Sequence, residues 1–167
     1  MYVTTHCAIP SVGEDHLVQE IRHRAEIADA LYRFALGQDL KDRELFLAAF
    51  TPDAELDFRP AAEKIGTEPV LFSGRSVIVD NILGLFAGRI DTTHTVSNPR
   101  ISLSADEAGL TALVEAQHVL IEDRRTYALL KNLYDVDLVR ENNRWLIRRL
   151  VIENVWFIGN PKAIFVG

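Results

Sequence analysis

Three side chains in this sequence could together carry acid–base chemistry: Asp39, His94 and His118. An imidazole with an unperturbed pKa near 6.5 can accept a proton at neutral pH. A carboxylate bonded to its other ring nitrogen fixes the tautomer and stabilises the imidazolium ion that forms. If the fold brings the acid and the histidines together, the sequence predicts general acid–base catalysis, with these three as the catalytic residues.

Asp39 stands out because it interrupts an apolar pattern. The preceding apolar positions recur at steps of three or four, typical of one face of a helix: Ile21, Ala25, Ala28, Tyr32 and Ala35. Asp39 takes the next position of this stripe, and a buried carboxylate needs a partner. We therefore expect Asp39 to point into a pocket and meet a histidine. The alternative is that Gly37 ends the helix and Asp39 caps the next one.

Strand alternation indicates which residues would share that pocket. In the strand predicted over residues 110–122, the more apolar face carries His118. The apolar face of the strand over 126–140 carries Asn132 and Tyr134, and Phe58 shares the inner face of an earlier strand. His94 begins the strand over 93–104. Polar groups that converge in an apolar hollow are what a pocket for a small hydrophobic molecule needs. The alternative for each is a structural role, such as a buried histidine satisfied within the core.

Other chemistries find little support. The sequence has no HxH, HxxxH or CxxC pattern, so we expect no metal site. It also lacks GxGxxG, GxxxxGK[ST] and GxSxG, the patterns of nucleotide cradles and serine hydrolases. Acid–base catalysis without a cofactor remains.

The elements that must position these residues change in type along the chain. The sequence predicts a helix over 14–36, a short one ending near residue 50, a strand at 54–58, a loop over 60–69, a short strand at 70–72 and a helix over 75–87. Long strands follow at 93–104, 110–122, 126–140 and 144–157. Helices followed by an antiparallel meander indicate an α+β fold. The apolar segment 156–166 is expected to fold back over an opening or to pack on a second subunit.

Composition narrows the class of protein. A chain of 167 residues with 48% hydrophobic residues suits one globular domain, here 14–167 after a tail at 1–13. The net charge of −6 without a basic stripe argues against nucleic acid and membrane partners. One cysteine, Cys7, permits no internal disulfide, and no export signal or spanning segment is evident. We expect a soluble cytoplasmic protein.

Four segments resemble SnoaL-like members of the nuclear transport factor 2-like superfamily: FALGQDLKD, LFLAAFTPDAELDF, TTHTVSN and YDVDLVRENNRWLIRR. The resemblance implies a cystatin-like conical barrel, with three N-terminal helices packed on a strongly curved antiparallel or mixed sheet. It also implies a homo-oligomer, either a dimer or a trimer.

Within the superfamily the sequence is most similar to scytalone dehydratase and related lyases. This similarity implies a dyad of Asp39 and His94, with His118 as a second strand histidine and Asn132 as a pocket amide. Gln38 and Phe58 stand where that dehydratase has tyrosines, so Tyr134 or Tyr32 would have to supply a phenol.

The expected function is that of a cofactor-independent lyase or isomerase, dehydratase-like, acting on a small hydrophobic and cyclic substrate. His94 would abstract the proton, Asp39 would orient the imidazole, and Tyr32, Phe58, Asn132 and Tyr134 would bind the substrate. Two alternatives remain open: a polyketide cyclase, and a ligand-binding protein or subunit of the same fold that catalyses nothing.

Overall fold

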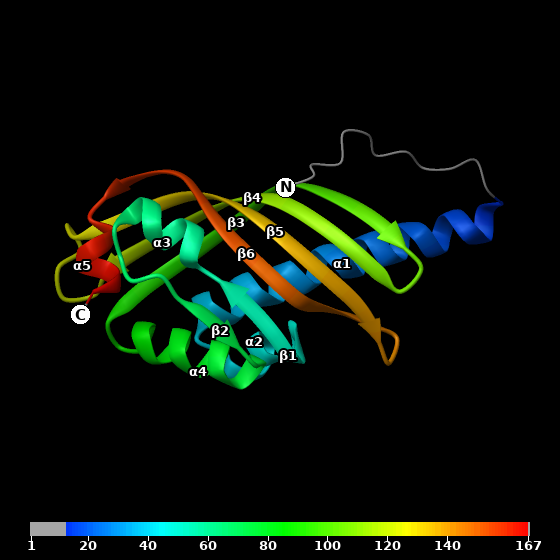
Figure 1. Ribbon diagram of the computed structural model, residues 1–167, viewed down its shortest axis with the longest axis horizontal. Helices are drawn as coiled ribbons and strands as arrows, with labels where there is room; N and C mark the ends of the chain where they lie inside the picture. The colour runs from blue at the N-terminus through cyan, green and yellow to red at the C-terminus, as the bar shows by residue number, and fades with distance from the viewer. Residues whose placement is uncertain (1–12, 167) are drawn as a thin grey trace.

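The computed structural model describes residues 13–166, and its centre is one strongly bent sheet of six strands (Figure 1). The order across the sheet is β2-β1-β6-β5-β4-β3. The strands are β1 (Phe50–Asp57), β2 (Leu71–Ser73), β3 (Ile90–Ser104), β4 (Glu107–Leu120), β5 (Tyr127–Glu141) and β6 (Arg144–Gly159). Strand β1 pairs with β6 in parallel, and all the other pairs are antiparallel. The predicted α+β class with a mixed sheet is confirmed.

The long meander β3 to β6 follows the predicted strands closely, because alternation and turn chemistry are local signals. Asn142 and Asn143 join β5 to β6, and both have positive φ angles, 47° and 63°. A type I′ hairpin turn requires positive φ at both central residues, which asparagine tolerates better than most residues. The turn therefore fixes the register in which Glu141 pairs with Arg144.

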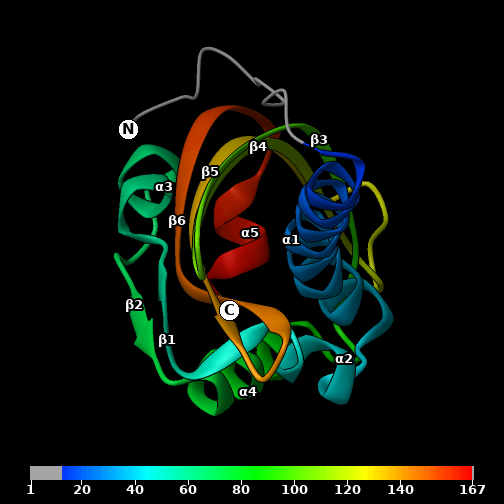
Figure 2. The same ribbon diagram turned by 90° about the vertical axis from the view of Figure 1, so that its right-hand side faces the viewer.

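Helix α1 (Glu14–Leu40) runs along the concave face of the sheet, and in Figure 2 the sheet curves around it. The expected end near residue 36 is wrong, since the helix passes through Gly37 and stops where Lys41 adopts a left-handed conformation with φ 58°. Asp42, rather than Asp39, caps α2 (Arg43–Leu47). Gly37 is instead needed for close packing, because a Cβ atom there would lie 2.6 Å from the Cα of Phe46.

The apolar stripe predicted on this helix is wrong at most of its positions, although its last member, Ala35, is buried. Ile21 and Tyr32 are 53% and 42% exposed. The buried face over residues 27–38 consists of Ile27, Ala30, Leu31, Phe34, Ala35, Gly37 and Gln38, spaced mainly at three and four. The sequence has apolar residues on both stripes, and the sheet selects the one with the larger side chains. Asp39 consequently lies at the edge of the buried face.

Three further helices close the structure: α3 (Arg59–Ile65), α4 (Arg75–Phe86) and α5 (Pro161–Phe165). Helix α4 was predicted. Helix α3 replaces an expected loop, because Pro60 sits at the helix start, where its missing N–H costs nothing, while Ile65 is buried. The C-terminal segment folds back, which was one of the two predictions for it, and α5 lies inside the curve of the sheet (Figure 2). Over residues 13–166, none of the helices combines the length and apolar character needed to cross a bilayer.

Candidate active site

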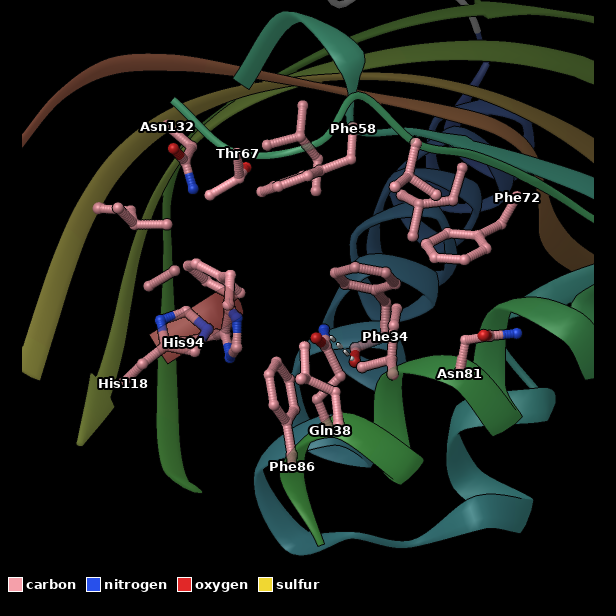
Figure 3. A pocket seen from close by; sticks show the side chains of 18 of the residues that line it. Phe34, Gln38, Phe58, Thr67, Phe72, Asn81, Phe86, His94, His118 and Asn132 are labelled. Atoms are coloured by element: carbon pink, nitrogen blue, oxygen red, sulfur yellow. Dashed lines mark hydrogen bonds between the residues drawn. The ribbon is translucent and has the colours of Figure 1, made fainter. Parts of the chain in front are cut away.

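A cavity of about 360 Å³ lies between the concave face of the sheet and helices α1, α4 and α5. Its volume falls within the range of small-molecule sites. Its walls are largely aromatic, with Phe34, Phe58, Phe72, Phe86 and Phe165 among the lining side chains. Figure 3 shows His94 and His118 together at one end and Phe72 at the other. The hollow is therefore largely apolar, and its two imidazoles gather at one end, with Asn81 on the side of Phe72 (Figure 3).

Asp39 and His94 meet beside this cavity. The Oδ1 atom of Asp39 lies 2.7 Å from Nδ1 of His94, and the backbone N–H of His94 donates to Oδ2 at 2.7 Å. A carboxylate only accepts, so Nδ1 carries the hydrogen and Nε2 is left as the acceptor. His94 lines the cavity and Asp39 does not, so the acid supports the imidazole from behind rather than pointing into the pocket as expected.

Two residues that the sequence analysis did not single out complete the surroundings of Asp39. The hydroxyl of Thr92 donates to Oδ1 at 2.9 Å, and Nζ of Lys41 donates to that hydroxyl at 3.1 Å. Burial by itself would raise the pKa of Asp39, but its contacts with His94 and Thr92 outweigh this effect and hold the pKa below its usual value. Asp39 is therefore ionised at neutral pH. Thr92 lies two residues before His94, so strand alternation could have placed both side chains on the same face of β3.

His118 shares the cavity with His94 but not its partners. It is 3% exposed on β4, opposite Thr92, and its ring centroid is 5.6 Å from that of His94. Its Nδ1 atom has no hydrogen-bond partner among the described residues. Burial, followed by the nearby charge of His94, lowers the pKa of His118 to about 3. The ring is neutral at physiological pH and can at most donate one hydrogen bond.

Asn132 and Tyr134 lie on the inner face of β5 and line the cavity, as the alternation predicts. The Nδ2 group of Asn154, a residue missed by the sequence analysis, donates to Oδ1 of Asn132 at 2.9 Å. This bond turns the amide so that Nδ2 of Asn132 points into the cavity (Figure 3). Burial raises the pKa of Tyr134, so its phenol stays protonated. Asn132 also forms a side-chain hydrogen bond with Tyr134, which acts against this rise in pKa.

The other predicted substrate-binding residues differ in whether they line the cavity. Phe58, which follows β1 rather than lying on it, lines the cavity, whereas Tyr32 lies on the exposed face of α1 and is absent from the lining. Gln38 is buried in the wall, and its Nε2 donates to the backbone oxygen of Phe34 at 3.2 Å. Among the described residues, no group of three or more metal-ligating side chains comes together.

Comparison with known proteins places this geometry in a family. Residues 19–151 match the SnoaL-like domain family. The chain belongs to that family. This SnoaL-like chain is 26% identical over 151 residues to the terrestric acid biosynthesis cluster protein E of Penicillium crustosum, covering 86% of the chain and 90% of that relative.

Solved structures share the fold of this SnoaL-like domain. A candidate scytalone dehydratase from Novosphingobium aromaticivorans superposes with a TM-score of 0.70 at 21% identity, over 88% of this chain and 91% of that one. A hexachlorocyclohexane dehydrochlorinase from Novosphingobium barchaimii gives a TM-score of 0.70 at 19% identity, over 85% and 92%. At such identities the likeness concerns the fold alone, and it agrees with the predicted architecture.

Proposed function

We propose that this protein is a cofactor-independent lyase or isomerase that uses His94 as its general base. The observation that carries the proposal is the 2.7 Å contact between Nδ1 of His94 and ionised Asp39, at the histidine end of a largely apolar cavity. Nε2 of His94 takes a proton from a carbon next to a carbonyl group, and Asp39 stabilises the imidazolium ion. A positioned base of this kind contributes about 10²–10⁴-fold to the rate.

The electrons from the broken C–H bond pass first into an enolate. In a dehydration the enolate re-forms the carbonyl and expels a hydroxyl group from the next carbon. This group takes the proton back from Nε2 of His94 and leaves as water, which returns the imidazole to its neutral form. In an isomerisation the proton returns to a different carbon instead. Asn132 and the phenol of Tyr134 present the donors that stabilise the enolate oxygen.

The lining favours an uncharged substrate with a ring. Among the described residues that line the cavity, Glu68, which is exposed, is the one carboxylate, and no lysine or arginine is present to pair with a substrate carboxylate. The aromatic walls suit a planar ring. The two enzymes named above are named for eliminations, and the fungal relative for a biosynthetic cluster, which supports small-molecule chemistry.

The test uses a panel of neutral cyclic β-hydroxy ketones and the corresponding enones, screened first by thermal shift and then for conversion by mass spectrometry. Asp39→Asn and His94→Ala should fold normally and lose about 10²–10⁴-fold in kcat/KM. Tyr32→Phe, a change on the exposed face of the same helix, is the matched control and should keep full activity.

Turnover that survives both site variants would exclude His94 as the base. Thermal stabilisation by ligands that are never converted would instead favour a ligand-binding protein of this fold, and ring closure of open-chain substrates a cyclase.

A further inference from the structure

A cation lies just beyond the end of α1, behind the Asp39–His94 pair and outside the cavity lining. Lys41 ends the helix in a left-handed conformation, which turns its side chain back toward β3. Its Nζ atom donates to Thr92 Oγ1 at 3.1 Å and lies 5.5 Å from the ring centroid of Phe86. The Lys41 ammonium group is thus held between a hydroxyl group and an aromatic ring.

The hydrogen bonds from Lys41 to the dyad can run in one direction only. A lysine ammonium group donates and cannot accept, whereas a carboxylate accepts and cannot donate. The Thr92 hydroxyl between them therefore accepts from Lys41 and gives its own hydrogen to Asp39. Thr92 is buried, so solvent does not compete readily for this bond. The result is an ordered chain from ammonium to hydroxyl to carboxylate to imidazole.

We infer that Lys41 is a positioning residue that limits how tightly the Asp39–His94 pair holds a proton, an inference that rests on the proposed function. Asp39 alone would stabilise the imidazolium ion strongly and slow the return of the proton. The positive charge of Lys41 opposes a second positive charge on His94, and the hydroxyl it orients shares the negative charge of Asp39. The base can then release its proton within each turnover.

The other charged and titratable groups around His94 do not duplicate this effect. Asp91 on β3 pairs with Arg124 at 2.8 Å, and both side chains are more than half exposed, so their charges largely cancel. His118 on β4 and Tyr134 on β5 are neutral at physiological pH. Burial lowers the pKa of Lys41 while Asp39 and Asp91 raise it, which agrees with a cation drawn partly out of solvent by the acid it serves.

The experiment is a titration of the His94 ring by NMR in the protein without substrate, which requires no knowledge of the ligand. In Lys41→Met the midpoint should rise by about half a pH unit to one unit, as expected for losing one partly screened charge near the ring. Lys41→Gln repeats the test with a polar side chain, and Lys41→Arg, which keeps the charge, should stay near the wild-type midpoint. Arg22→Met is the matched control: it changes the net charge equally, but at an exposed site near the far end of α1.

A midpoint in Lys41→Met and Lys41→Gln that stays within the change caused by Arg22→Met would overturn the inference. Its failure is distinguishable from failure of the proposed function, because the titration reports on the dyad whether or not any substrate is turned over. Once a substrate is known, the acidic limb of the kcat/KM profile of Lys41→Met should move to higher pH in parallel.

Discussion

His94 and His118 stand on neighbouring strands with their rings 5.6 Å apart, yet their surroundings are opposite. His94 contacts a carboxylate through both its ring and its backbone N–H. His118 packs against Phe86 and Phe165, at centroid distances of 5.4 and 5.0 Å, and its Nδ1 has no partner among the described residues. The same side chain in the same cavity is therefore bonded to a carboxylate in one place and is a neutral ring without such a partner in the other.

The contrast shows that the partner of a histidine, more than the cavity it lines, decides what it can do. Transfer of an imidazolium ion out of water is unfavourable unless an opposite charge compensates. Asp39 supplies that charge to His94 at 2.7 Å, and burial without such a contact holds the pKa of His118 at about 3. Neighbouring groups whose environments differ in this way can take separate acid–base roles.

The largest expected effect comes from the same substitution made at each histidine in turn. His94→Gln should reduce kcat/KM by about 10²–10⁴-fold, because the base is lost. His118→Gln should reduce it by about 10-fold at most, the equivalent of one neutral hydrogen bond. Steady-state kinetics on the substrate found by the panel make the comparison. Equal losses at the two positions would remove the functional distinction between them.

An intermediate effect concerns stability against pH. As pH falls below about 6.5, the unfolded chain binds a proton at His118, while the folded chain does not until about pH 3. Protons therefore favour unfolding, and the stabilising contribution present above pH 6.5 is lost as the pH falls. Between pH 7 and 4.5 the wild type should lose free energy of unfolding. His118→Gln should lose about 2 to 3 kcal/mol less than the wild type does.

Urea unfolding at the two pH values measures this difference, and His16→Gln, a change at an exposed histidine, is the control. In this control the free energy of unfolding should decrease between the two pH values by as much as in the wild type. If the decrease in His118→Gln equals that of the wild type, the buried ring is already protonated or solvated in the folded protein.

The smallest expected effect concerns the support behind His94. Thr92→Val keeps the shape of the side chain but removes the hydroxyl that joins Lys41 to Asp39, and it should lower the free energy of unfolding by about 1 kcal/mol. Thr93→Val makes the same change one residue later on the exposed face of β3 and should be nearly neutral. Chemical denaturation at pH 7 compares the two. A cost no greater for Thr92 than for Thr93 would show that the hydroxyl does little to hold the carboxylate.

The sequence by itself determined the strands and the direction in which their side chains point. Alternation with a period of two placed His118, Asn132 and Tyr134 inside before any contact was known. The same local reasoning failed on α1, where two apolar stripes compete and the sheet decides which is buried. It failed again at α3, where Pro60 suggested a loop but begins a helix.

Only the tertiary structure decided which polar side chains meet. The family resemblance had implied the pair of Asp39 and His94, which are 55 residues apart, but nothing in the sequence joined Lys41 to Thr92, 51 residues apart, or Asn132 to Asn154 on different strands. Periodicity reports the face on which a residue lies, but a hydrogen bond depends on a distance set by how two elements pack and how far each extends. The last turn of α1, beyond Gly37, carries Asp39 to β3, and the missing side chain of that glycine lets Phe46 of α2 pack closely against it.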